Sequence, residues 1–530
     1  ANVGAVDVDA PDVSKAYAVD EDASKASKAD EIDVDIPDAT ETDGVYRDAL
    51  HRTADAGNVY YVATSGSDQN PGTLEKPFLT LERAAQSLQA GDTCYIRGGV
   101  YRETLRPVHS GTADKRITYA AYNGERVVIS GAEELSGWTR DTGSIFQAEM
   151  EWDLSDQNQI FVNGEMMTEA RWPNNKGSLL EPTLASIDSG THTTMKVNGL
   201  PGGDDYWKGA KASIIGGKQW IAWPSEVLSF DAASKTLTIK PRAAEANVNY
   251  DPGDDGRGNK TEFMLTGLKS ELDTEDEWWY DSKGRRLYLW APGGGNPSGM
   301  RVEAKRRELT IDLKGLSYID ICGIEAFAGR IGTNSASTHN RLRKLKCSYV
   351  SHSYQKSVPG VVLQGSFNEI DSCEMQYASH SIVQTNGADN RIVNSYLHDG
   401  NYACSFDGMV SVQGERMLVS HNTMCRSGRD VVYLCKTKGA LIQYNDISDA
   451  GLRTSDVGMI YIVRGDMGNS VFRYNRVHGA HSKSLGMGIY LDAQTHNMIV
   501  HHNLVYDGGE FPILDNGPSG YALLFNNTLS

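Results

Sequence analysis

The stretch "HNTMCRSGRDVVYLCKTKGALIQYNDISDA", residues 421–450, contains the repeat from which the fold can be inferred. It contains two copies of one motif, in which an asparagine, Asn422 or Asn445, stands beside a short strand-like run. A repeat of this length, with short strands and a small or amide residue at a fixed turn, is typical of a solenoid whose coils hydrogen-bond to one another. The stretch therefore predicts an all-β protein built as a parallel β-solenoid.

The same turn recurs on both sides of this stretch, at intervals of 22 to 30 residues. Aligning the segments after residue 306 places nine residues in one column: Gly323, Cys347, Cys373, Ser395, Asn422, Asn445, Asn475, Asn503 and Asn527. An asparagine amide both donates and accepts hydrogen bonds, so stacked asparagines can extend the ladder through a bend. We therefore expect this column to be a structural ladder and not a binding site.

Composition divides the chain into four parts. We interpret residues 1–57 as an acidic, disordered leader, residues 58–134 as an N-terminal cap with the first coils, residues 135–305 as an inserted antiparallel β-sandwich module, and residues 306–530 as the main parallel β-helix. The first 50 residues hold 14 Asp or Glu against 4 Lys or Arg and few aromatic residues, which is typical of a solvated linker. The main helix stops within a coil, so its last edge is either bare or cut short.

Two local patterns support the cap and the insertion. Residues 76–91, "KPFLTLERAAQSLQAG", place apolar residues at helical spacing, which predicts a helix that covers the open edge of the first coil. Residues 226–241 and 277–292 each read as two strands around a turn containing Lys or Gly. The second pattern predicts antiparallel hairpins within the insertion.

The formal net charge of -18 limits the partners that the protein can bind. A nucleic acid or an anionic membrane needs a basic surface, so both are disfavoured, and a neutral or weakly charged partner fits better. No run of about 18 apolar residues is present, which argues against membrane insertion. No basic-then-apolar leader is present and the chain opens on Ala1, so we expect that any signal peptide has been removed and that this is a mature or truncated product. We also expect the protein to act as a monomer.

Aligned strands ahead of the asparagine turn contain candidate catalytic residues. The segments "VVYLCK", "MIYIVR", "GIYLDA" and "PILDNG" place Tyr433, Tyr461, Tyr490 and Ile513 in one column and Cys435, Val463, Asp492 and Asp515 in another. Stacked strands are about 4.8 Å apart, so Asp492 and Asp515 would be close carboxylates. Such a pair, with one protonated acid and one carboxylate, is what a glycosidase needs. The alternative interpretation is that both side chains cap backbone amides at strand ends.

Asp456, in "RTSDVGMIY", is the third catalytic candidate because it ends a loop that lengthens its coil to 30 residues. Longer loops on a rigid scaffold are where sites are usually built. The residues around it are unusually polar, although an aspartate turn ahead of Gly458 would explain Asp456 equally well. The candidates for substrate binding are Tyr461, Arg464, His481, Lys483, Tyr490 and, from the insertion, Trp172. No metal-binding spacing is present, and no cofactor is expected.

Three segments carry a family resemblance. Residues 60–103 resemble the opening of secreted right-handed parallel β-helix polysaccharide-active enzymes, including polysaccharide lyase family 9. Residues 160–174, "IFVNGEMMTEARWPN", and "GRRLYLWAP" are similar to the β-sandwich insertion of glycoside hydrolase families 120 and 141. The resemblance implies a glycosidase that uses paired carboxylates, which map best onto Asp456 and Asp492. Ala493 stands where a second acidic residue is expected, so Asp515 remains a candidate.

The resemblance implies a secreted, periplasmic or cell-surface protein whose partner is an oligo- or polysaccharide. The leading hypothesis is a glycoside hydrolase, and the first alternative is a polysaccharide lyase in which Lys436, Arg464 or Lys483 abstracts a proton beside a uronate carboxylate. In a lyase, Ca²⁺ would bind the aspartates of residues 251–256 or the aspartate cluster. The second alternative is a non-catalytic glycan-binding solenoid.

Overall fold

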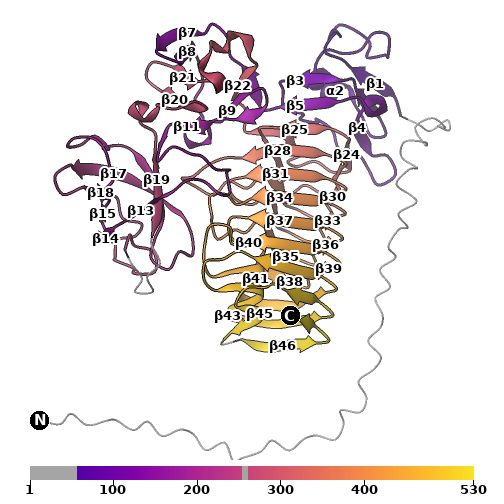
Figure 1. The fold of residues 1–530 in the computed structure, drawn as a ribbon. Coiled ribbons are helices and arrows are strands. Elements are labelled where there is room, and N and C mark those ends of the chain that lie inside the picture. The colour runs from indigo at the N-terminus through magenta and orange to yellow at the C-terminus, as the bar shows by residue number, and fades with distance from the viewer. Residues whose placement is uncertain (1–56, 254–260, 518) are drawn as a thin grey trace, which may run out of the picture. The chain divides into compact units, whose positions relative to one another are not determined.

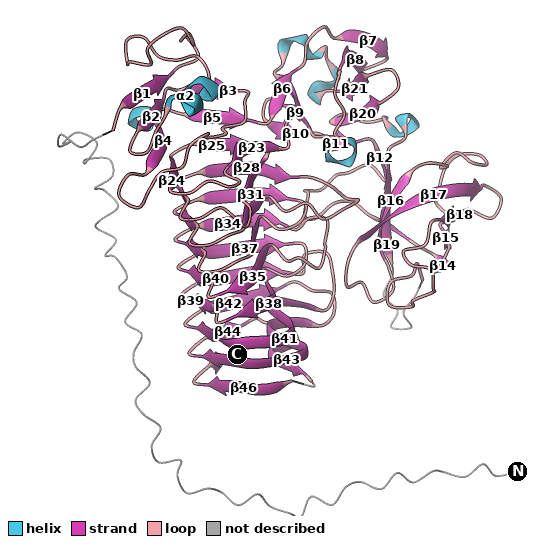
Figure 2. Ribbon diagram, turned by 180° about the vertical axis from the view of Figure 1, so that it is seen from behind, coloured by secondary structure: helices cyan, strands magenta, loops and turns pink. Residues whose placement is uncertain are grey.

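The computed structural model describes residues 57–253, 261–517 and 519–530. The acidic segment predicted at 1–57 therefore lies, except for Gly57, outside the described residues. Stacked parallel strands form the main body, and antiparallel strands from the middle of the sequence lie beside them (Figures 1 and 2). One short α-helix belongs to the first coils. The predicted all-β fold, a parallel β-helix with an antiparallel insertion and an N-terminal helix, is confirmed.

Each coil of the β-helix contributes strands to three parallel columns, which we call columns A, B and C. Column A holds β23 (Leu309–Asp312), β26 (Arg330–Gly332), β29 (Val361–Leu363), β32 (Val383–Thr385), β35 (Val410–Glu415), β38 (Val432–Lys438) and β45 (Phe511–Asn516). Column B holds β1 (Val59–Val62), β2 (Thr93–Ile96), β4 (Ile117–Ala121), β24 (Ile319–Cys322), β27 (Arg341–Arg343), β30 (Glu369–Asp371), β33 (Arg391–Val393), β36 (Leu418–Ser420), β39 (Leu441–Gln443) and β46 (Gly520–Phe525). The long strands β41 (Val457–Arg473) and β43 (Gly486–His501) run through both columns.

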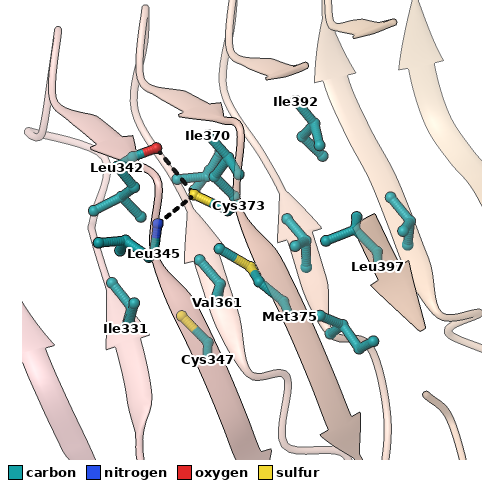
Figure 3. Close-up of a cluster of buried hydrophobic side chains, with 14 of the residues drawn as sticks. Ile331, Leu342, Leu345, Cys347, Val361, Ile370, Cys373, Met375, Ile392 and Leu397 are labelled. Atoms are coloured by element: carbon teal, nitrogen blue, oxygen red, sulfur yellow. Dashed lines mark hydrogen bonds between the residues drawn. The ribbon is translucent and has the colours of Figure 1, made fainter. Parts of the chain in front are cut away.

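Column C completes each coil after the asparagine turn. It holds β3 (Gly99–Tyr101), β5 (Val127–Ser130), β25 (Glu325–Phe327), β28 (Lys346–Ser351), β31 (Glu374–Ala378), β34 (Tyr396–Gly400), β37 (Thr423–Ser427), β40 (Asp446–Ala450), β42 (Arg476–Ala480), β44 (Leu504–Tyr506) and β47 (Thr528–Leu529). Apolar side chains from all three columns point inward and form one continuous core along the coils. Figure 3 shows part of it, in which Ile331, Val361 and Met375 are buried.

The insertion forms three sheets, in which the strand pairs are antiparallel except for β11 with β20. The first contains β6 (Ala132–Glu134), β9 (Ile160–Val162), β10 (Glu165–Met166) and β22 (Val302–Lys305). The second contains β7 (Thr139–Thr142), β8 (Ile145–Glu149), β11 (Thr168–Glu169), β20 (Glu277–Asp281) and β21 (Arg286–Trp290). The third contains β12 (Arg171–Trp172), β13 (Ala185–Ser186), β14 (Ser189–Thr191), β15 (Thr194–Lys196), β16 (Lys211–Ile215), β17 (Trp223–Asp231), β18 (Thr236–Ile239) and β19 (Glu262–Thr266). Both predicted hairpins, β17 with β18 and β20 with β21, are confirmed.

The helix α2 spans Leu81–Ser87, which is shorter than the predicted 76–91. Asp68 explains the later start, because its carboxylate accepts the amides of Leu79 and Thr80 and holds that segment extended. The Thr80 hydroxyl then caps the helix by accepting from the Arg83 amide at 3.1 Å. Its apolar residues, including Leu81, are buried in the core of the first coils, as the capping role requires. Short 3₁₀ turns occur at η3 (Tyr122–Gly124), η4 (Ser155–Gln157), η5 (Lys269–Glu271), η6 (Pro292–Gly294) and η7 (Pro297–Gly299).

The predicted asparagine ladder is confirmed in its later part. From Asn422 through Asn445, Asn475 and Asn503 to Asn527, each side-chain oxygen accepts both the backbone and the side-chain N–H of the preceding asparagine, at 3.0–3.1 Å. Ser395 and Cys373 continue the column toward the N-terminus through their side chains. A second ladder, Asn340 with Asn368 and Asn390, lies at the turn between columns A and B and was not foreseen.

The first two residues predicted for this ladder, Gly323 and Cys347, are wrong. The register Lys346↔Glu374 places Leu345, and not Cys347, opposite Cys373, and Glu325↔Lys346 places Ile324, and not Gly323, before it. Figure 3 shows the outcome, with the Leu345 amide donating to Cys373 Sγ at 3.4 Å. Apolar residues take the place of the amide here, so no polar motif marks the turn in the sequence.

Replacing Asn475 with alanine is expected to lower the melting temperature. The change leaves the buried N–H groups of Asn445 without an acceptor, and each unsatisfied group costs about 1–3 kcal/mol. Calorimetry would measure the shift. The control is Asn198→Ala, at an exposed asparagine of the insertion. Equal melting temperatures for the two variants would contradict the structural role of the ladder.

Candidate active site

A pocket of about 490 Å³ opens between the last coils and the insertion. It is lined by Trp220, Tyr250, Phe406, Arg429, Tyr433, Cys435, Asp456, Tyr461, Val463, Arg464, Tyr490, Asp492 and Asn516. Five of the residues predicted for the site are among them: Asp456, Asp492, Tyr461, Arg464 and Tyr490. Two carboxyl groups surrounded by aromatic rings can bind and protonate a polar, ring-shaped ligand.

Strand register produces the acidic and aromatic columns. Tyr433 pairs with Tyr461, and Tyr461 pairs with Tyr490, so the tyrosines stack on one face as predicted. Val463 pairs with Asp492, two residues further on and therefore on the same face. The rings of Tyr461 and Tyr490 meet edge to face at 4.9 Å. Asp492 thus enters the pocket at a position where the preceding coil places a valine.

The prediction that Asp515 joins this acidic column is wrong. In the structure Asp515 pairs with Leu491, and Asn516 pairs with Asp492. A register slip of one residue moves a side chain to the other face of a strand, so Asp515 points away from the pocket. Its carboxylate is exposed and accepts a hydrogen bond from the Ser519 hydroxyl. The residue beside Asp492 is therefore an amide and not a second carboxylate.

Both oxygens of Asp492 accept hydrogen bonds. The Tyr461 hydroxyl donates to Oδ2 at 2.5 Å, and Asn516 Nδ2 donates to Oδ1 at 2.9 Å. These two hydrogen bonds fix the orientation of the Asp492 carboxylate in the pocket, as a nucleophile or a base requires.

Asp456 is half-buried and directly precedes β41. Burial raises the pKa of its carboxyl group, and the nearby Asp492 raises it further, while Arg429 and the hydrogen bond from Tyr490 act in the opposite direction. The Tyr490 hydroxyl donates to Oδ1 at 3.2 Å and itself accepts from Asn516 Nδ2 at 3.2 Å. One hydrogen-bonded chain therefore links Asp456 to Asp492, and the burial of Asp456 suits that group to the role of an acid.

A buried ion pair that the sequence analysis missed holds the Asp456 segment. Arg429 and Asp430 bond to each other with side chains 1% and 0% exposed. Arg429 Nη2 donates to the carbonyl of Asp456 at 3.2 Å, and Asp430 Oδ1 accepts the amide of Gly458 at 3.0 Å. Gly458 is required because a Cβ there would lie 2.9 Å from Tyr490 Cβ. The sequence did contain a signal for this ion pair, because two adjacent charged residues stand directly before the apolar run of β38.

The insertion supplies one wall of the pocket through residues other than the predicted Trp172. Trp220 and Tyr250 pack edge to face at 5.7 Å and line the pocket, while Trp172 packs against Trp207 and Phe263 in the core of the insertion. Trp220 is fixed to the β-helix because its carbonyl accepts from Arg429 Nε at 2.8 Å. The sequence placed a tryptophan in the wall but could not identify which one.

The remaining predicted residues lie outside the pocket lining. His481 Nε2 bonds to Asp449 at 2.7 Å, and Lys483 Nζ pairs with Glu262 of β19 at 2.8 Å. Lys483 therefore ties the insertion to the β-helix. Among the described residues, no group of three or more His, Cys, Asp or Glu side chains could hold a metal ion. The calcium candidate at 251–256 extends beyond the described part of the chain.

The fold and pocket define a right-handed parallel β-helix protein with an acidic, aromatic site. A family model described as "Pel9A-like, right handed beta helix region" matches residues 60–168, and one described as "Right handed beta helix region" matches residues 336–528. A solved structure titled "Glycoside hydrolase" superposes with a TM-score of 0.74 at 17% identity, covering 89% of this chain and 97% of that chain. "The complex structure of XylC with xylose" gives 0.53 at 15% identity, covering 86% and 70%.

Two curated proteins match shorter segments. The uncharacterized protein YwoF of Bacillus subtilis is 42% identical over 123 residues, which are 23% of this chain and 24% of that protein. Pectate lyase PEL9 of Emericella nidulans is 41% identical over 83 residues, which are 15% of this chain and 20% of that protein. The matches thus span a quarter or less of either relative. No helix in the described part of the chain has the length and apolar character needed to cross a membrane.

Proposed function

We propose that this protein is a glycoside hydrolase that binds a glycan in the pocket between the last coils and the insertion. The observation that carries the proposal is the linked pair of carboxyl groups, Asp456 and Asp492, with the Tyr490 hydroxyl and Asn516 amide between them. Aromatic side chains of Trp220 and Tyr250 can stack on sugar faces. The solved glycoside hydrolase of the same fold supports the class of reaction.

In the proposed mechanism Asp456 is the general acid. Its raised pKa keeps it protonated at a higher pH than an exposed aspartate, so it can deliver a proton to the oxygen of the departing sugar. Asp492 attacks the anomeric carbon or activates a water molecule that does so. Tyr461 fixes the carboxylate through its 2.5 Å hydrogen bond. If Asp492 is the nucleophile, water then attacks the anomeric carbon, the bond between the sugar and Asp492 breaks, and Asp456 takes back a proton from that water. If Asp492 is the base, it takes the proton of the attacking water, and both aspartates then exchange protons with solvent.

A polysaccharide lyase is the second candidate, and Arg464 is the observation that favours it. Of the three proposed bases, Arg464 lines the pocket, Lys483 is paired with Glu262, and Lys436 is not part of the pocket lining. Pectate lyase PEL9 supports this class through its local sequence match. Lyase products contain an unsaturated uronide that absorbs in the ultraviolet, whereas hydrolysis products do not.

An activity on glycans agrees with a location outside the cytoplasm, either secreted, periplasmic or on the cell surface, and with action as a monomer. We therefore include this location in the proposal.

A panel of aryl glycosides and polysaccharides tests the proposed function. We expect release of reducing sugar without ultraviolet-absorbing product, and NMR of the first product would reveal whether the anomeric configuration is retained or inverted. The control is the Asp492→Asn variant, which should release none. Unsaturated products from uronate polymers would establish the lyase instead. Binding of glycans without turnover of any of them would contradict both enzymes and support a glycan-binding solenoid.

A further inference from the structure

Two positively charged side chains at the rim of the pocket have no carboxylate partner among the described residues. Arg464 lines the pocket, is exposed, and its side chain makes no hydrogen bond or ion pair with another described residue. Lys218 places its Nζ 5.0 Å from the ring centre of Trp220, which lines the same pocket. Most other arginines near these coils are paired, as Arg476 is with Asp446 at 2.6 Å. Free cations at a pocket rim are available to an anionic ligand.

An irregularity of the backbone places Arg464 at the rim of the pocket. Between the pairs Val463↔Asp492 and Gly465↔Thr495 the register shifts, so Arg464 alone stands opposite two residues of β43. Arg464 also has a left-handed φ of +54°. Such bulges redirect a side chain and are common beside active sites. Strand β41 thus departs from regular pairing at Arg464, the residue that carries the positive charge.

The local charge balance favours an anion although the whole chain is acidic. Arg429 is neutralised by Asp430, which leaves Lys218 and Arg464 against Asp492 and the carboxyl of Asp456. When Asp456 holds the proton that the proposed acid role requires, the pocket carries one surplus positive charge. Charges farther away than about 8 Å are largely screened at physiological salt, so the -18 of the whole chain has little weight at the rim.

We infer that the pocket selects a glycan whose bound sugar carries a carboxylate, a uronic acid residue, held by Arg464 and Lys218. The inference rests on the proposed function for the location of the sugar ring. A guanidinium matches the two oxygens of a carboxylate in a bidentate arrangement, and an ammonium adds a second charge-assisted hydrogen bond. The sugar ring would then lie between these cations and the two aspartates, over Trp220 and Tyr250. The inference differs from the sequence-based expectation of a neutral or weakly charged partner.

The test compares methyl glycosides that differ only at C6. The methyl glycosides of glucuronic and galacturonic acid, the matching glucosides and galactosides, and their 6-sulfates are titrated by ligand-observed NMR. The protein used is the full chain with Asp456→Asn, which lacks the acid group and does not consume the ligand. We expect a uronide to bind roughly tenfold or more tightly than its neutral counterpart, as a charged hydrogen bond permits. Higher salt should reduce this preference.

Variants of Arg464 and Lys218 then show whether these two side chains cause the preference for the uronide. Arg464→Gln and Lys218→Gln should each remove most of the preference for the uronide over the neutral sugar. Lys240→Gln is the control, because this exposed lysine of the insertion loses the same charge away from the pocket. Equal binding of uronide and neutral sugar, a preference that survives both substitutions, or tighter binding of the 6-sulfate would each overturn the inference. Uronide binding by a wild-type protein that hydrolyses nothing would contradict the proposed function alone.

Discussion

The Asp456→Asn variant is expected to lower kcat by about 10²–10⁴-fold, the range that a positioned general acid contributes. Asparagine keeps the shape of the side chain and its hydrogen bond with Tyr490 but has no proton to give to the leaving oxygen. The loss should be largest for glycosides of alcohols and smallest for glycosides of acidic phenols, because an acidic phenol departs without protonation. Initial rates on a series of aryl glycosides would measure this dependence.

The pH dependence provides a second readout of the same group. Burial raises the pKa of Asp456, so the wild-type rate should fall as the pH rises through that pKa and the acid loses its proton. The Asp456→Asn variant should lack this decline. Asp515→Asn is the matched control, because Asp515 is an exposed aspartate of the neighbouring coil that bonds to Ser519 outside the pocket. A variant of Asp456 that kept the wild-type rate and pH profile would exclude the acid role.

Replacing Asp430 with alanine is expected to destabilise the protein by about 3–5 kcal/mol, the cost of removing one partner of a buried ion pair. Arg429, 1% exposed, would keep its charge without a counter-ion, and the Gly458 amide would lose its acceptor. Calorimetric melting would measure the loss. Asp389→Ala is the control, because Asp389 forms a comparable pair with Arg416 on the exposed surface. Similar shifts in melting temperature for both variants would contradict the claim that the buried ion pair stabilises the protein more than the exposed one.

Replacing both charged residues with apolar ones distinguishes the effect of their charges from the effect of their packing. The double variant Arg429→Met, Asp430→Leu should recover part of the lost stability, since no unpaired charge remains buried. A double variant that melts no higher than Asp430→Ala would show that the unpaired charge of Arg429 is not the main cost of the single substitution.

The sequence predicts best those features that depend on local repetition. The asparagines from Asn422 onward recur at one turn because each must bond to the next, so their spacing revealed the coils directly. Where the turn carries Leu345 or Ile324, an apolar side chain replaces the amide, and the alignment slipped by one or two residues. The same kind of slip placed Asp515, and not Asn516, beside Asp492.

The repeat pattern was enough to predict the β-helix and the helix at its start. It also predicted that Asp456, Asp492, Tyr461, Arg464 and Tyr490 lie near one another, since neighbouring coils stack in chain order. Which residues of the insertion reach the pocket could be seen only in the folded protein. Trp220, Tyr250 and Lys218 are separated from Asp456 by about two hundred residues of sequence, and their approach depends on how the insertion packs on the coils. Strand periodicity fixes the face of a side chain, but packing between separate sheets has no period that a sequence can display.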